Sequence, residues 1–289
     1  MLLRGYGGQT LASVMSVTET HAGYPARMSK RRLDTLLAER GLYESRSRAA
    51  AAVMAGDVRV GRRSARKPGE LVADDADVTV AAAPPFVSRG GVKLANALEA
   101  FGIDPGGRRA LDAGASTGGF TDCLLKRGAA EVIALDVAYG ELHWSLRQDP
   151  RVTVVERRNA RALEPGELPF APDLIVADLS FISLTKVLPA VLACAAPGFD
   201  CLALVKPQFE VGRERVGRGG VVRSPADRRA ALLKVALHAR EAAGVEVLGF
   251  ASSGLPGPAG NRESFVWLGP RGREGAIADL EAAVREVEP

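Results

Sequence analysis

Between residues 86 and 268, short apolar runs alternate with amphipathic stretches, and this rhythm limits the possible folds most strongly. The pattern predicts strands at 110–112, 132–136, 152–155, 174–178, 202–206, 245–251 and 264–268, with helices at 91–101, 119–127, 184–195 and 226–243. Strands that alternate with helices favour parallel βαβ units, so we expect an α/β, doubly wound, Rossmann-like sheet. Ligands of such sheets bind beyond the carboxyl ends of the strands.

The preceding residues have a different organisation. Residues 1–27 show no period and are expected to be a disordered extension. Residues 28–82 predict a small α+β domain, with one helix capped by Ser29, a second capped by Ser45, and short strands near 58–60 and 78–80. Pro84 and Pro85 predict a linker at 83–87, because consecutive prolines exclude helix and strand pairing. The second domain then covers 88–289.

Positive charge is concentrated in the first domain. Between Arg27 and Lys67 there are 12 lysines and arginines against 4 acidic residues, whereas the rest of the chain has 26 against 30. A basic module joined to a mildly acidic body indicates an arm that docks on a polyanion. RNA, DNA and anionic lipid remain open at this point.

Composition excludes several classes of protein. Hydrophobic residues make up 47% of the chain and charged residues 25%, a globular balance. The most apolar stretch, 187–205, is interrupted by Pro189, Pro197 and Asp200, which argues against a membrane span. Three cysteines without a CxxC pair and three histidines argue against a disulfide scaffold and a metal site. We therefore expect a soluble, cytoplasmic protein without a metal.

A glycine-rich turn follows the first strand of the second domain. Residues 111–120 read LDAGASTGGF at a strand-to-helix junction, where glycines permit close approach to a ligand and the helix offers amide donors. Asp136 ends the next strand, where a carboxylate can bind both hydroxyls of an adenosine ribose. The turn lacks the GxGxxG spacing, so S-adenosylmethionine fits it better than a dinucleotide. The same turn also spells GxSxG, the nucleophile elbow of hydrolases, but the only histidine well downstream, His238, lies in a predicted helix.

Charged residues recur near the ends of later elements. Asp178 and Lys206 are the last residues of successive predicted strands, on the edge that carries the glycine turn, whereas Lys93 opens the second domain and Glu263 lies on a late loop. Each has an ordinary structural explanation: a helix-surface charge for Lys93, a cap for Asp178, a snorkelling side chain for Lys206 and a salt-bridge partner for Glu263. Their convergence at one edge favours a functional role.

Four strings carry a family resemblance: GASTGGFTD at 114–122, ADLSFISL at 177–184, VKPQFE at 205–210 and LPGPAGNRE at 255–263. Because these four strings occur in this order, residues 29–268 closely resemble the TlyA family of ribosomal RNA cytidine 2′-O-methyltransferases, also known as the haemolysin A family. The first domain resembles the ribosomal-protein-S-four-type RNA-binding domain. The second resembles the FtsJ-like, S-adenosylmethionine-dependent methyltransferase fold.

The resemblance implies a catalytic Lys-Asp-Lys-Glu tetrad, which falls here on Lys93, Asp178, Lys206 and Glu263. A ribose hydroxyl is a poor nucleophile, so a base must take its proton during attack on the sulfonium methyl. We assign that role to Lys206, which Asp178 would orient, while Lys93 and Glu263 would hold the ribose. A lysine serves as a base only where burial and a second cation bring its pKa toward ~7–8.

The resemblance also implies the ligand contacts. The ribose of S-adenosylmethionine would lie on Asp136, its adenine near Asn159 and Ala160, and its charged end near Asp178. Its methionine end would lie against Gly114, Ala115, Ser116, Thr117, Gly118, Gly119 and Phe120. Folded RNA would be held through its phosphates by Lys30, Arg31, Arg32, Arg46 and Arg48. The expected partner is ribosomal RNA or a ribosomal subunit. The nucleotide, the subunit and the oligomeric state are left open. Two alternatives are a membrane-acting haemolysin and a non-catalytic RNA-binding assembly factor.

Overall fold

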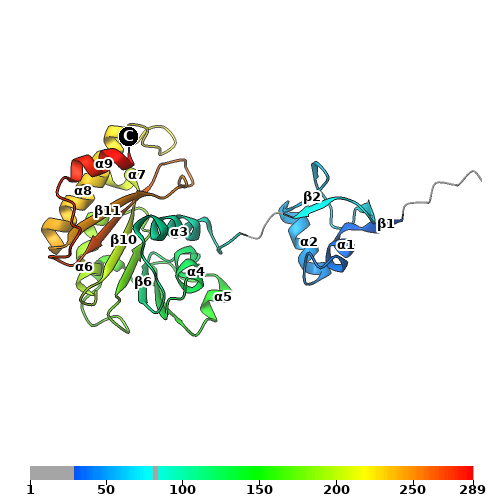
Figure 1. The fold of residues 1–289 in the computed structure, drawn as a ribbon, viewed down its shortest axis with the longest axis horizontal. Helices are drawn as coiled ribbons and strands as arrows, with labels where there is room; N and C mark the ends of the chain where they lie inside the picture. Colours follow the sequence, from blue (N-terminus) through cyan, green and yellow to red (C-terminus); the bar gives the residue numbers. More distant parts are fainter. Residues whose placement is uncertain (1–28, 81–83, 289) are drawn as a thin grey trace, which may run out of the picture. The chain divides into compact units, whose positions relative to one another are not determined.

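The computed structural model describes residues 29–80 and 84–288. They form two compact units, which divide between Ala83 and Pro84, and each is described by itself (Figure 1). The predicted disordered extension at 1–27 lies outside the described residues. Within the described ranges, no helix combines the length and apolar character needed to cross a bilayer.

The first unit packs two helices against two small antiparallel sheets. Strand β1 (Lys30–Arg32) pairs with β4 (Leu71–Ala73), and β2 (Val58–Val60) lies between β3 (Arg63–Ser64) and β5 (Val78–Val80). Helices α1 (Leu33–Glu39) and α2 (Arg46–Ala55) complete the unit. Its small core contains Leu33, Leu36, Leu37, Ala49, Val53, Val58, Ala65 and Val72.

One predicted helix cap in this unit is correct and one is wrong. The Ser45 hydroxyl accepts a hydrogen bond from the backbone N–H of Arg48, as expected for the cap of α2. Ser29 does not cap α1, because the residues after it form strand β1 and the helix begins only at Leu33. The pairing of Arg31 with Val72, a contact between distant residues, keeps this segment extended.

The second unit contains a seven-stranded sheet, as the alternating pattern predicts. Its strands are ordered β11-β12-β10-β9-β6-β7-β8. The bounds are β6 (Arg109–Ala113), β7 (Glu131–Leu135), β8 (Val152–Val155), β9 (Leu174–Ala177), β10 (Asp200–Val205), β11 (Glu246–Ser252) and β12 (Ser264–Gly269). The strand order reverses at β6 and β9, which are parallel neighbours at the centre. That reversal marks the position where doubly wound sheets bind ligands.

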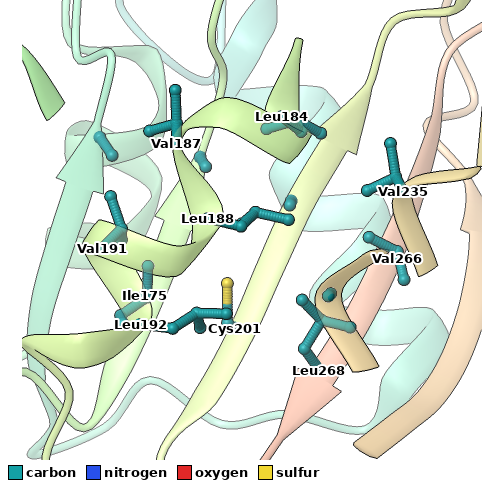
Figure 2. Close-up of a cluster of buried hydrophobic side chains, with 14 of the residues drawn as sticks. Ile175, Leu184, Val187, Leu188, Val191, Leu192, Cys201, Val235, Val266 and Leu268 are labelled. Carbon is teal, nitrogen blue, oxygen red and sulfur yellow. The ribbon is translucent and has the colours of Figure 1, made fainter. Parts of the chain in front are cut away.

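Helices cover both faces of this sheet (Figure 1). One face carries α3 (Arg89–Phe101), α4 (Gly119–Lys126) and α5 (Trp144–Arg147), and the other carries α6 (Leu188–Ala193), α8 (Pro225–Ala243) and α9 (Leu280–Val287). Side chains alternate between the faces: in β9, Ile175 joins the cluster under α6 and α8, whereas Leu174 joins the cluster under α3 and α4. Figure 2 shows part of the first cluster, with Leu188 near Cys201 and Val235 near Val266.

Strand β12 departs from the parallel arrangement. It is antiparallel to both β10 and β11. Only residues 253–263 connect β11 to β12, and they contain no helix. Parallel neighbours need a crossover of a dozen or more residues, so this short connection produces a hairpin. As a result, β12 begins at the sheet edge where β10 ends, with Ser264 opposite Val205.

The helix predicted at 184–195 is divided. A 3-10 turn, η2 (Leu184–Lys186), precedes α6, and Pro189 occupies the first turn of α6. Proline has no N–H to continue an upstream helix, and its ring collides with the carbonyl four residues earlier. Further short elements not predicted from the sequence are α5, α7 (Pro207–Glu210), α9, η1 (Ala160–Ala162) and η3 (Arg213–Arg215).

Candidate active site

The sheet brings together the residues that follow β6, β7, β9 and β10. In register, Ala113 lies between Leu135 and Ala177, and Ala177 also pairs with Ala203 of β10. The glycine turn, Asp136, Asp178 and Lys206 therefore leave the same edge of the sheet. All three charged residues were expected inside strands, but they lie one residue beyond them, where their side chains are no longer constrained to the two packed faces.

The glycine turn is built around Gly114. Its backbone has φ +90, and a Cβ placed there would lie 2.7 Å from the carbonyl oxygen of Asp178. Glycine therefore allows the turn after β6 and the segment after β9 to touch. Gly118 also has a positive φ and is the residue before α4. Leu142 and Leu146 fill the space beside it, and it lines neither of the two cavities described below. Gly118 shapes the turn in this structure, and its contact with the cofactor stays a prediction.

Asp112 connects β6 to the first turn of α4, on either side of the glycine turn. The sequence analysis assigned no role to this residue. Its Oδ2 accepts hydrogen bonds from the backbone N–H of Thr121 at 2.9 Å and from the Thr121 hydroxyl at 2.7 Å. The carboxyl is fully buried, and desolvation, followed by the neighbouring charge of Asp178, raises its pKa from 3.8 to about 7. An acid at the end of a buried apolar strand is the sequence feature that could have revealed it.

Two adjoining cavities of about 440 Å³ each open at this edge. They share Gly114, Ser116, Asp178 and Ser180 in their linings, so together they form one elongated site. The first cavity, called here the lysine cavity, contains both Lys93 and Lys206 in its wall. The second, called the nucleoside cavity, is lined by Asp136, Leu135, Val137, Asn159, Ala160 and Ile182, among others.

Asp136 is fixed by two backbone hydrogen bonds. Its Oδ2 accepts from Ser116 N–H and its Oδ1 from Ala138 N–H, both at 2.8 Å. Each carboxylate oxygen retains a lone pair for a further donor, such as a ribose hydroxyl. Asn159 caps η1, and its side-chain oxygen accepts from Arg161 N–H at 3.0 Å. That hydrogen bond is a turn contact, and the residue also lines the nucleoside cavity.

Lys206 and Asp178 form an ion pair in the wall of the lysine cavity. The distance from Lys206 Nζ to Asp178 Oδ1 is 2.7 Å, and Nζ also donates to the Ser180 hydroxyl at 2.8 Å. Both side chains are mostly buried, with 12% and 24% of their surface exposed. Pro207 begins a helical turn directly after the lysine, which ends the strand and directs the side chain across to the β9 loop.

Lys93 and Glu263 form a second ion pair, with 2.5 Å between Lys93 Nζ and Glu263 Oε2. The two side chains are only 8% and 0% exposed, so the helix-surface explanation for Lys93 is wrong, whereas the salt-bridge explanation for Glu263 is correct. Glu263 does not line the lysine cavity and lies behind Lys93. A Cβ at Gly257 would come within 2.3 Å of Glu263 Oε1, so glycine is needed there for this carboxylate to fit.

The rim of the site contains an aromatic pair that sequence analysis missed. Phe181 is 91% exposed, lines the nucleoside cavity and has φ +64, an unusual conformation for a large residue. Its ring centroid lies 5.3 Å from that of Phe209, which follows Lys206 in the chain. Both rings belong to the strings that carry the family resemblance. The sequence feature that could have indicated this pair is the presence of two apolar aromatic residues within polar loops.

Glu210 connects the two loops that carry this pair. Its Oε2 accepts from the Ser183 hydroxyl at 2.6 Å and its Oε1 from Leu184 N–H at 2.7 Å. Lys234 of α8 lies 3.4 Å from the same carboxylate. Glu210 is buried. The segment that begins with Asp178 is thereby attached to the segment that begins with Lys206.

The residues predicted to bind RNA are all exposed on the first unit. Arg32 and Arg46 approach the buried carboxylate of Asp34, with closest distances of 2.8 and 3.2 Å. Hydrogen bonding by Arg32, above all, holds the pKa of that carboxyl well below its usual range. Arg31 contacts Glu39 and Asp74, whereas Lys30 and Arg48 have no ion pair within the described ranges.

The elongated site fits the expected S-adenosylmethionine. Leu135, Val137 and Ile182 offer an apolar wall for a planar base, and the carboxylate of Asp136 suits ribose hydroxyls. Asp178 lies where the two cavities meet, and its negative charge suits a cationic donor better than a phosphate. Among the described residues, histidine, cysteine and carboxylate side chains do not gather into a candidate metal site.

Comparison with known proteins agrees with this geometry. The FtsJ-like methyltransferase family matches residues 86–270, and the S4 domain matches residues 31–78. The 16S/23S rRNA (cytidine-2′-O)-methyltransferase TlyA of Mycobacterium tuberculosis is 54% identical over 239 residues, covering 82% of this chain and 89% of that protein. Hemolysin A of Brachyspira hyodysenteriae is 40% identical, covering 66% and 80%.

A solved structure agrees over nearly the whole length. A Streptococcus thermophilus protein, 37% identical, matches with a TM-score of 0.68 and covers 90% of this chain and 96% of its own. The strand order, the two-part cavity and these matches point to one conclusion. The chain belongs to the FtsJ-like methyltransferase family and carries an S4 domain ahead of its methyltransferase fold.

Proposed function

We propose that this chain transfers the methyl group of S-adenosylmethionine to the ribose 2′-hydroxyl of a cytidine in ribosomal RNA. The observation that carries the proposal is the placement of Lys206, Asp178 and Lys93 in a cavity that continues into the nucleoside cavity of Asp136. The nucleoside cavity would hold the adenosine, and the lysine cavity would then receive the acceptor sugar. The M. tuberculosis relative is named for this reaction on 16S and 23S rRNA.

In this proposal, Lys206 is the base. S-adenosylmethionine supplies an electrophilic methyl group on a sulfonium. Lys206 Nζ would take the proton of the 2′-hydroxyl as that oxygen forms its bond to the methyl carbon, and the methyl–sulfur bond would break to leave a neutral thioether. Asp178, 2.7 Å from Nζ, stabilises the ammonium that results, and the Ser180 hydroxyl fixes the direction of Nζ. Lys93 faces the same cavity.

Glu263 has a different role from the other three. It is separated from the cavity by Lys93, so we propose it as a positioning residue that holds the Lys93 ammonium in the wall. Lys93 would then donate a hydrogen bond to an acceptor sugar oxygen. Gly114, Ala115, Ser116, Thr117, Gly119 and Phe120 line the lysine cavity and would contact the methionine end of the donor.

The S4 domain would dock the RNA. Exposed Lys30, Arg31, Arg32, Arg46 and Arg48 can contact phosphates, which position a folded RNA without reading its sequence. Arg32 and Arg46 would divide their donors between RNA and Asp34. An RNA substrate of this kind would place the protein with ribosomes in the cytoplasm.

The proposal is tested with the variant Lys206→Ala. Purified protein is incubated with ribosomal subunits and methyl-tritiated S-adenosylmethionine, and cofactor binding is followed separately by calorimetry. We expect the variant to lose methyl transfer by at least about 100-fold, since general-base catalysis contributes roughly 10²–10⁴-fold. Its cofactor affinity should stay within a few-fold of the wild-type value.

Three results would oppose the proposal. Transfer by Lys206→Ala at the wild-type rate would refute the role of this lysine. A wild-type protein that binds subunits and transfers no methyl group would favour a non-catalytic assembly factor. Leakage of dye from liposomes, in the absence of methyl transfer, would favour a membrane-acting haemolysin.

A further inference from the structure

A glycine-rich hairpin at residues 217–222 follows the Lys206 segment in the chain. Gly217 N–H donates to the Val221 carbonyl at 3.1 Å, and Gly220 N–H donates to the Gly217 carbonyl at 3.0 Å. Residues 217–220 are exposed, and Arg218 lies at the tip. Nothing in the proposed chemistry so far uses this hairpin.

Asn261 attaches the hairpin to another loop. Its side chain is 1% exposed, and its Nδ2 donates to the Gly220 carbonyl at 2.7 Å. Its Oδ1 accepts from Val222 N–H at 2.8 Å. A buried amide with both functions satisfied gives a fixed geometry, because breaking either bond would leave a buried polar group without a partner. The exposed hairpin is therefore held in one position.

The attachment places the hairpin at the edge of the active site. Asn261 lies three residues before Ser264, and Ser264 pairs with Val205, the residue before Lys206. The same loop contributes Pro256 and Pro258 to the wall of the lysine cavity. The hairpin, the loop and Lys206 therefore all lie at the carboxyl end of β10.

Three exposed arginines at this edge have no acidic partner among the described residues. Arg218, Arg223 and Arg262 are exposed, and none has a carboxylate within ion-pair distance among the residues described. Arg215, on the same stretch of chain, contrasts with them because it contacts Asp227 at 3.4 Å. Guanidinium groups match phosphate geometry and bind it in bidentate fashion. An anionic ligand at this edge would find three free guanidinium groups.

We propose that the hairpin, with Arg223 and Arg262, binds backbone phosphates of the RNA strand that presents the target nucleotide. The inference rests on the proposed function and adds a second RNA-binding surface, on the methyltransferase unit. Phosphate contacts orient a strand without reading its bases. Because Asn261 holds the hairpin in place before RNA arrives, little conformational entropy is lost on binding. The surface would align the ribose with the lysine cavity.

The test compares arginine-to-glutamine variants in the full chain. Arg218→Gln, Arg223→Gln and Arg262→Gln are made singly and together, and Arg271→Gln is the matched control. Arg271 is exposed and lies after Gly269, where β12 ends at the opposite edge of the sheet. Binding to purified 30S and 50S subunits from cells lacking the gene is measured over a series of salt concentrations, and cofactor affinity is measured by calorimetry.

The triple variant should bind its subunit about tenfold more weakly, and its log–log salt slope should be smaller by about 2, because each lost phosphate contact removes somewhat less than one released counterion. Arg271→Gln should match the wild type, and cofactor affinity should be unchanged in every variant. Asn261→Ala should weaken binding in the native background and add little to the triple variant, since it acts through the arginines.

Failure of this inference differs from failure of the proposed function. If the wild type binds and methylates a subunit while the triple variant shows the same affinity and salt slope, the hairpin proposal is wrong and the function stands. If the wild type binds neither subunit, the proposed function falls and the hairpin proposal falls with it.

Discussion

Asp112 lies one residue before the end of strand β6 and has a carboxyl group that solvent does not reach. Both of its hydrogen bonds come from Thr121 in the first turn of α4, so it connects the strand to the helix that follows the glycine turn. Burial favours the protonated acid and raises its pKa to about 7. The unfolded chain would ionise the same group near pH ~4. Folding and protonation are therefore linked at this residue.

The sign of the linkage gives a prediction. Between pH ~4 and ~7 the folded state holds this proton more tightly than the unfolded state, so the Asp112 contribution to stability falls as pH rises and levels off above about 7. Asp112→Asn keeps the acceptor for Thr121 and cannot ionise. Its stability relative to wild type should rise by on the order of 2 kcal/mol between pH 5 and pH 7.

Urea unfolding at pH 5, 6, 7 and 8 measures this difference. Glu241→Gln removes a carboxylate from an exposed position of α8 and serves as the control. It should show no comparable dependence on pH. A difference between Asp112→Asn and wild type that stays flat from pH 5 to pH 8 would contradict the account of Asp112.

At the scale of elements, Glu210 links the two loops of the active site. It holds Ser183 and Leu184 from the end of α7, and so sets how the Asp178 segment faces the Lys206 segment. We expect Glu210→Ala to lower kcat about tenfold or more, because loss of these acceptors leaves Leu184 N–H buried without a partner and loosens the loop. Glu210→Gln can keep both contacts through its oxygen and amide, and should retain most activity.

Lys234→Met leaves the Ser183 and Leu184 contacts of the Glu210 side chain in place. It removes the ammonium 3.4 Å from the Glu210 carboxylate, together with its 2.6 Å hydrogen bond to the Glu210 backbone carbonyl, and should leave kcat nearly unchanged. Steady-state methyl transfer and thermal unfolding are measured for all three variants. A purely structural role predicts that activity follows melting temperature across the series. A kcat of Glu210→Ala equal to that of Glu210→Gln would contradict the positioning role.

Strand ends were the part of the site that sequence could predict. In a parallel sheet, residues after successive strands meet at one edge, so the periodic pattern was enough to bring Asp136, Asp178 and Lys206 together with the glycine turn. The same logic failed for β12, because strand direction depends on the length and content of the connection. It also failed for β1, whose extended form depends on pairing with β4.

Contacts between distant segments could not be predicted by pattern. The pairing of Lys93 with Glu263 joins residues 170 positions apart, and the burial of both side chains depends on how α3 packs beside the start of β12. Glu210 and Asn261 likewise act through partners on other loops. The resemblance supplied Lys93 and Glu263 as site residues, whereas their arrangement, with one behind the other, came only from the structure.

At the scale of the whole molecule, the proposed function would be divided between the two units. The S4 domain carries the concentrated positive charge, and the methyltransferase unit carries the elongated cavity with its lysines. The relatives that match both units cover most of their own length as well as most of this chain. Docking and chemistry in one chain would let a weak nucleophile be held at the methyl donor.

The most direct measurement maps 2′-O-methyl groups on ribosomal RNA. Cells lacking this gene are compared with the same cells supplied with the wild-type gene or with the Lys206→Ala variant. We predict at least one cytidine 2′-O-methyl group that is absent without the gene, returns with the wild type and does not return with the variant. Identical maps in all three strains, or full methylation by the variant, would contradict the central claim.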